Sequence, residues 1–206
     1  MRLIAIVGFC LVGWWSAQAE APSLLPYKSA HWKQTVTIGA TAPGKLQKVE
    51  AELWFLKPDQ MRVVTTVEGR RQVIVIKSGT ALVFEEGATT GMKMPLKQQM
   101  LDQLAQYTEV FSKLDTWKKA KTGEEKLGDK ACDIYSFSDK SGGLTTTGKV
   151  WLWAEKNFPM RMILEAQGQS VTVEHSDVQV NEGVSPAMFE APAGVKFVDL
   201  PSGSVK

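Results

Sequence analysis

The sequence predicts a mainly β fold with one helix, in which an antiparallel sheet curls around an apolar interior. Short β-type segments separated by turns follow one another along most of the chain, which is typical of antiparallel meanders. Several of these segments are apolar on both faces, unlike strands that have one face in water. One long segment, 95–117, has the three- and four-residue apolar spacing of a helix.

The first residues have the pattern of a secretory signal peptide. Arg2 precedes an apolar run from Leu3 to Trp15, and the A-x-A site at Ala17-Gln18-Ala19 predicts cleavage after residue 19. The apolar run is shorter than the ~20 residues of a spanning helix, which disfavours an uncleaved membrane anchor. We therefore predict a signal peptide at 1–19, a single domain at 20–206, a periplasmic location and no transmembrane segment after cleavage.

In the first half of the chain, alternation and turn residues predict a run of strands. Residues 20–30 contain two prolines and are expected to form an extended lead-in. Strands are predicted at 32–40, 49–55, 61–67, 72–76 and 81–84, separated by turns at Pro43-Gly44, Lys57-Pro58-Asp59, Glu68-Gly69-Arg70 and Ser78-Gly79. The last two of these strands, QVIVI and ALVF, are apolar on both faces.

The single helix is predicted over Pro95–Trp117. Proline suits the first helical position because its missing N–H would have no partner there. Apolar residues recur at helical spacing through Leu96, Met100, Leu101, Leu104, Phe111 and Leu114. We expect this helix to cover the mouth of the curled sheet.

Strands resume in the second half of the chain. They are predicted at about 118–127, 130–138, 145–155, 158–167 and 169–180, followed by a helical turn at Ser185–Phe189 and a short strand at Gly194–Val198. In the stretch GKVWLWAEKNFPM, Val150 and Leu152 point to one face and Trp151 and Trp153 to the other. One of these two apolar sets must face the concavity. The sequence leaves the choice open, and we favour the indoles together with the methionines.

Composition excludes several classes of function. The chain carries 24 Lys and Arg against 22 Asp and Glu, so its nearly neutral charge gives no argument for nucleic-acid binding. Cys132 is the only cysteine outside the signal peptide, so no intramolecular disulfide is expected, and we interpret it as a small buried residue. Two distant histidines and one cysteine do not predict a metal site, and no cofactor is expected.

Catalysis is not predicted either. Ser176 and Asp177 follow His175, but neighbours on a strand point to opposite faces, which disfavours a Ser-His-Asp triad. We expect His175 to be a solvated strand residue, and the doublets Glu85-Glu86 and Glu124-Glu125 to be solvated edges. An enzyme would require His31, His175 and acidic groups to converge in space.

Aromatic and methionine residues are abundant in the predicted domain. A core packed under one helix accounts for one apolar face of the sheet, whereas a curled sheet that accepts a ligand accounts for two. Methionine is frequent on surfaces that accept variable apolar partners. Both interpretations remain open on the pattern alone.

Four motifs resemble those of a known family. The stretch Leu53–Arg62 (LWFLKPDQMR) is similar to the L-W-x-x-[RK]-P-x-x-[FM]-R strand–turn–strand of periplasmic outer-membrane lipoprotein carriers, the Lol carrier superfamily. Val73–Phe84 resembles their hairpin, Cys132–Arg161 their Y-x-l…v-W-l…l-P-x-r pattern, and Val184–Val195 their C-terminal motif. The matches run in order across about 45–200.

The resemblance implies an incomplete antiparallel β-barrel whose apolar concave interior is lidded by helices and receives acyl chains. The expected function is that of a non-catalytic periplasmic binder or carrier of lipoproteins or other acylated or lipidic ligands. Expected partners are lipoprotein acyl chains or lipid, and an inner- or outer-membrane envelope protein. The alternative is an envelope interaction or sensor module that binds a protein partner on the same fold.

The expected ligand-binding residues are the apolar side chains predicted to line the interior. They are Trp54, Met61, Met92, Met94, Leu101, Leu104, Trp151, Trp153, Met160 and Met162. Lys57 falls where the carriers have a basic residue implicated in lid control and transfer. The chain departs from the family in that Lys57 replaces the usual Arg, which is a different kind of donor. The lead-in 20–30 is also too short and proline-broken to be the carriers' N-terminal helix.

Overall fold

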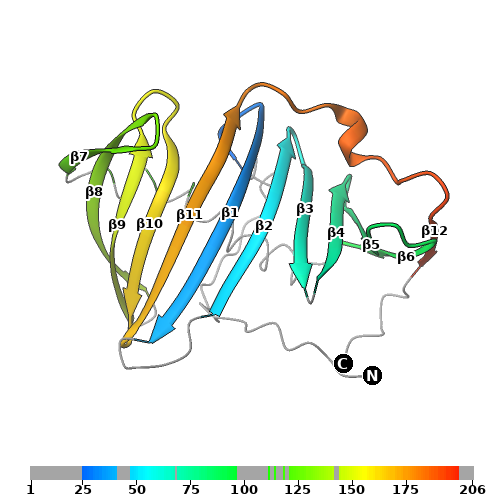
Figure 1. Cartoon of the computed structure of the whole chain (residues 1–206), viewed down its shortest axis with the longest axis horizontal. Coiled ribbons are helices and arrows are strands. Elements are labelled where there is room, and N and C mark those ends of the chain that lie inside the picture. Colours follow the sequence, from blue (N-terminus) through cyan, green and yellow to red (C-terminus); the bar gives the residue numbers. More distant parts are fainter. Residues whose placement is uncertain are drawn as a thin grey trace.

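The described strands form one curved sheet. The computed structural model describes residues 25–40, 47–67, 69–96, 111, 114, 118, 121–141 and 144–199. Within this part, twelve strands lie in the order β12-β6-β5-β4-β3-β2-β1-β11-β10-β9-β8-β7 (Figure 1). The prediction of a mostly β, curved antiparallel sheet is confirmed.

Two antiparallel meanders make up most of the sheet. The first contains β1 (Ser29–Ala40), β2 (Gln47–Leu56), β3 (Gln60–Val67), β4 (Arg70–Lys77), β5 (Thr80–Glu85) and β6 (Thr90–Pro95). The second contains β7 (Lys121–Leu127), β8 (Lys130–Ser141), β9 (Leu144–Trp153), β10 (Phe158–Ala166) and β11 (Gln169–Val180). Gly69 and Gly79 have φ values of 78° and 71°, which glycine tolerates and which the tight turns on either side of β4 require.

The two meanders join at the centre, where β1 pairs antiparallel with both β2 and β11. The β1–β11 register shifts between His31 and Lys33, where β11 contains one extra residue. Asp177 lies in this bulge with a φ of 52°, and its carboxylate is 2.8 Å from the Lys33 ammonium.

The chain after β11 crosses to the far edge of the sheet (Figure 1). We call residues 181–195 the strap. It contains the 3₁₀ helix η1 (Pro186–Phe189), capped by the Ser185 hydroxyl, which accepts from the Ala187 N–H. It leads to β12 (Lys196–Asp199), which pairs in parallel with β6. Phe189 is buried against a cluster on one face of the sheet made of Val64, Val73, Val75 and Phe84.

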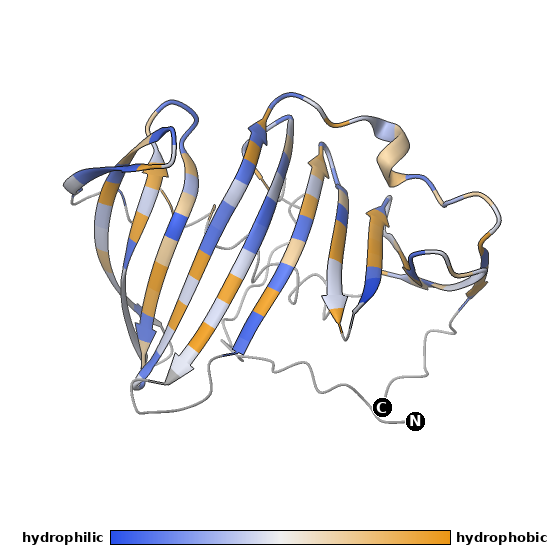
Figure 2. Ribbon diagram, viewed as in Figure 1, coloured by the Kyte–Doolittle hydropathy of each residue, from blue (hydrophilic) through white to orange (hydrophobic). Residues whose placement is uncertain are grey.

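The ladder register defines an inner and an outer face. We call the face that carries Trp32 the inner face. Directly paired residues share a face, so it continues through Leu53, Val63 and Ile74 on β2 to β4. In the other direction it continues from Gln34 and Val36 on β1 to His175 and Val173, then to Met162 and Val150. Hydropathy alternates along the central strands (Figure 2).

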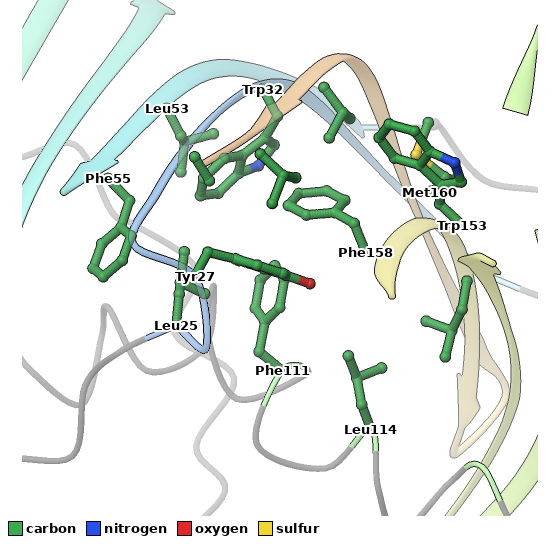
Figure 3. Packing of buried hydrophobic residues seen from close by; sticks show 14 of the residues in the cluster. Leu25, Tyr27, Trp32, Leu53, Phe55, Phe111, Leu114, Trp153, Phe158 and Met160 are labelled. Carbon is green, nitrogen blue, oxygen red and sulfur yellow. The ribbon is translucent and has the colours of Figure 1, made fainter. Parts of the chain in front are cut away.

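The interior of the curve contains Leu25 and Tyr27 from before β1, together with Phe111 and Leu114 (Figure 3). Phe111 and Leu114 are helical and buried, and the Lys118 N–H donates to the Leu114 carbonyl at 2.9 Å. The rest of the predicted helix after residue 96 lies outside the described residues. Its role as a lid stays a prediction, as do the signal peptide and the single-domain assignment.

The predicted start of the helix is wrong. Pro95 is the last residue of β6 and pairs with Thr80 on β5. The pairing of β12 with β6 ends at Lys93, so the missing N–H of Pro95 interrupts no ladder on that side. The strand β6 itself was not predicted, whereas η1 was predicted at the residues where it is found.

Phe189 should anchor the strap. Its side chain is 1% exposed, so Phe189→Ala is expected to lower the free energy of unfolding by about 3–5 kcal/mol through lost burial and a cavity. Urea denaturation measures the change. The matched control is Val198→Ala on β12, whose side chain is 60% exposed and whose effect should stay within about 0.5 kcal/mol. Equal effects of the two substitutions would contradict the anchoring role.

Candidate functional site

An aromatic cluster occupies the inner face where the two meanders join. The ring of Trp32 lies 5.7 Å from Phe158 and 6.3 Å from Phe111, both in edge-to-face geometry. Tyr27 packs edge-to-face on Phe111 at 6.1 Å and lies 5.7 Å from Phe158. Figure 3 shows these rings within the curve of the sheet. The residues come from β1, β10, the lead-in and the helical segment, so the cluster ties together four separate parts of the chain.

Three polar side chains accompany this cluster. The Tyr27 hydroxyl donates to the Asn157 carbonyl at 2.8 Å, and burial raises the pKa of this phenol. The two nitrogens of His175 lie 2.5 Å from the Pro159 carbonyl and 3.2 Å from the side-chain oxygen of Gln34. The Pro159 oxygen only accepts, so Nδ1 carries the proton. A neutral ring then presents Nε2 as an acceptor, which requires the Gln34 amide to turn its NH₂ toward it.

Burial of His175 corrects the sequence-based expectation of a solvated strand residue. Its side chain faces inward beside Trp32 at 6.2 Å between ring centroids. Desolvation lowers the pKa of its imidazole to about 4, so the ring is neutral near pH 7.

Trp32 is the one tryptophan of the described residues whose buried indole nitrogen has no hydrogen-bond partner. Its side chain is fully buried, and the Nε1–H lies within the curve of the sheet (Figure 3). A buried donor left without an acceptor costs roughly 1–3 kcal/mol. The inner face therefore contains a buried donor that has no acceptor among the described residues.

The structure brings together about half of the predicted ligand-binding residues. Met61, Trp151, Trp153, Met160 and Met162 are buried in the main cluster, and Met94 packs half-buried against it. Met92 is 43% exposed. Trp54 lies on the outer face, stacked on His31 at 4.8 Å. Leu101 and Leu104 lie outside the described residues, and the ligand-binding role of the whole set stays a prediction.

The register corrects the expectation that the Trp151 indole faces inward. Trp151 pairs with Arg161, which pairs with Glu174, and these two charged side chains form an ion pair at 3.0 Å. The neighbouring residue Val150 lies on the inner face instead, where it pairs with Met162. Trp151 is buried on the outer face because its Nε1–H donates to Glu125 at 2.6 Å and Arg161 lies 5.7 Å from its ring. Glu125 is therefore more than a solvated edge.

Of the two remaining predicted site residues, Trp153 is buried beside a lysine, whereas Lys57 is exposed to solvent. The Lys130 ammonium lies 4.5 Å from the centre of the Trp153 ring, a cation–π contact. Lys57 is exposed in the turn between β2 and β3, and its backbone N–H donates to the Lys28 carbonyl at 3.0 Å. A role of Lys57 in lid control or transfer stays a prediction.

The two histidines do not converge. His31 is on the outer face, 3.0 Å from Glu52, whereas His175 is on the inner face. In the part of the chain that the structure describes, no group of three His, Cys, Asp or Glu side chains is placed to hold a metal ion. Cys132 is buried, as expected, and burial raises the pKa of its thiol.

Sequence reasoning did not identify Tyr27, Trp32, Phe158, Gln34 and His175 as a group. Their common signal is weak, because they come from distant segments that only the β1–β11 pairing brings together. Trp32 and Gln34 share a face by simple alternation, which was the available clue.

Comparison with known proteins identifies the fold. No protein-family model and no curated protein sequence matches the chain. Among solved structures, MucB is similar with a TM-score of 0.50 at 13% identity, over 84% of this chain and 60% of that one. A LolA superfamily protein from Nitrosomonas europaea has a TM-score of 0.45 at 14% identity, over 81% and 92% of the two chains.

A third similar structure is lipoprotein LppX from Mycobacterium tuberculosis, with a TM-score of 0.46 at 12% identity over 78% of this chain and 90% of that one. These similarities concern the fold alone, and they agree with the fold expected from the resemblance to the lipoprotein-carrier superfamily. Within the described residues, no helix is both long and apolar enough to cross a bilayer.

His175 predicts a pH dependence of stability. An imidazole with an ordinary pKa near 6.5 in the unfolded chain and about 4 in the folded one binds more protons when unfolded. The contribution of the neutral His175 ring to the free energy of unfolding is therefore complete above pH 6.5 and is lost as the pH falls toward 4. Between these values the free energy of unfolding should fall by up to about 1.4 kcal/mol per pH unit. Urea denaturation of the wild type and His175→Gln from pH 7 to 5 measures it. An equal slope in both proteins would contradict the assignment.

Proposed function

We propose that this protein is a non-catalytic periplasmic binder or carrier of acylated or lipidic ligands, which occupy the concave inner face of the sheet. The observation that carries the proposal is the continuous apolar inner face. It crosses from β4 to β9, and Leu25, Tyr27, Phe111 and Leu114 are packed into its curve. The resemblance of the chain to lipoprotein carriers supports it.

Apolar burial would supply the affinity. Each buried methylene gains about 0.8 kcal/mol, so a chain of roughly 16 carbons gains on the order of 10 kcal/mol before ordering costs. Half-buried inner-face residues such as Ile74, Met94 and Val173 already pack against the main cluster and offer further surface to such a chain. The free donor of Trp32 adds a polar preference, because an ester or carboxyl oxygen of the ligand satisfies it.

The neutral state of His175 suits the same role. A charged imidazole beside an acyl chain would be costly, and its low pKa keeps the interior uncharged. The signal peptide predicted at 1–19 supports export to the periplasm, where lipoproteins and lipid must cross an aqueous space.

Lipid extraction of the full protein purified from the periplasm, followed by mass spectrometry, tests the proposal. We expect copurified acyl lipids in the wild type and in Thr66→Glu, whose exposed site is on the outer face, and a loss of most of the lipid in Met94→Glu. Circular dichroism checks that both variants fold. A lipid-free wild type that captures one envelope protein would contradict the carrier proposal and favour the interaction or sensor module.

Trp32→Phe isolates the polar part of recognition. The wild type should prefer methyl palmitate over hexadecane in competition with a fluorescent fatty-acid probe. The variant keeps an aromatic ring and loses the N–H, so this preference should fall by about 3- to 10-fold, the value of one neutral hydrogen bond. Because both ligands meet the same smaller ring, the ratio of their affinities is insensitive to the change in volume. An unchanged ratio would remove Trp32 from the site.

A further inference from the structure

A cleft of about 380 Å³ opens on the outer face, away from the concave interior. It is lined by Arg62 on β3, Phe84 on β5, the β5–β6 turn (86–89) and part of the strap (192–195). The Lys196 N–H donates to the Thr89 carbonyl at 2.9 Å, which fixes the end of the strap against the turn. The volume is in the range of small-molecule sites.

Arg62 is the cationic group of this cleft. Its guanidinium lies 5.9 Å from the Trp54 ring and donates one hydrogen bond, from Nη1 to the Met188 carbonyl at 3.3 Å. Among the described residues it forms no ion pair. Half-burial between the sheet and the strap lowers the pKa of Arg62. A guanidinium has five N–H donors in a planar fork, so most of the donors of Arg62 are without a described acceptor.

The neighbouring charges are paired among themselves. Glu86 also lines the cleft, but its carboxylate is 2.9 Å from Arg71, which lies 3.8 Å from Glu52 as well. On the strap, Glu190 pairs with Lys77. Arg62 is therefore the one charge lining the cleft that forms no ion pair among the described residues, although the Glu86 and Glu52 carboxylates are near enough to act on it electrostatically.

We propose that this cleft binds a small organic carboxylate, whose two oxygens accept from Arg62 and whose apolar part packs on Phe84, Pro192 and Val195. A guanidinium matches a carboxylate in a bidentate pair. A single negative charge is favoured over a doubly charged phosphate, because the Glu86 carboxylate lines the same cleft and repels added charge. The cleft is on the opposite face from the proposed lipid site, so this proposal is independent of that function.

Titration of the full, ¹⁵N-labelled protein with sodium butyrate at constant ionic strength tests the proposal. We expect saturable shifts of the amides of Gly87, Thr89 and Gly194, which surround the cleft. Arg62→Gln should raise the dissociation constant by about tenfold or more, as expected for the loss of a charge-assisted hydrogen bond. The matched control is Arg70→Gln, an exposed arginine on β4 that pairs with Glu85 outside the cleft and should leave the affinity unchanged.

Further measurements separate binding from a structural role of Arg62. Hydrogen exchange of residues 186–197 reports whether the strap stays docked in Arg62→Gln, whose amide can still donate to Met188. A docked strap with weakened butyrate binding supports the proposal. Butyrate binding that is non-saturable, that is equal in Arg62→Gln and wild type, or that is weaker than the binding of inorganic phosphate would overturn it.

Discussion

β1 pairs with β2 on one side and with β11 on the other, and this double pairing joins two meanders that are separate in the sequence. Because side chains alternate along a strand and directly paired residues share a face, the face of Trp32 determines which face its ladder partners occupy, except where a bulge shifts the register. The extra residue at Asp177 shifts β11 by one position and so places His175, rather than Ser176, opposite Gln34. The buried site depends on that single-residue adjustment.

The strand segments were predictable because alternation and turn residues are local signals. The strands from β8 to β11, and η1, lie close to their predicted ranges. β6 was missed because TGMKMP has little β propensity and ends in proline, and its place in the sheet comes from pairing with β5 and β12. The inward or outward choice at Val150 and Trp151 was not predictable, because both sets are apolar and only the register with β10 decides between them.

The apolar outer face also changes the inference that two-sided strands require a ligand. The strap buries Val64, Val73 and Val75 under Phe189, and Glu125 and Arg161 contact the indole of Trp151. Much of the hydrophobic surface that sequence reasoning assigned to an interior is therefore covered by the chain itself. The case for a lipid ligand therefore depends on the inner face alone.

On that inner face the polar groups are more informative than the apolar ones. A packed core would be most stable if each buried donor had an acceptor, and Tyr27 and His175 meet this condition through Asn157 and Pro159. Trp32 does not, although it lies in the same cluster. The unmet donor costs free energy. Under the proposed function, a ligand oxygen that accepts from this N–H would recover that cost, so the proposal favours an acyl group over a plain hydrocarbon.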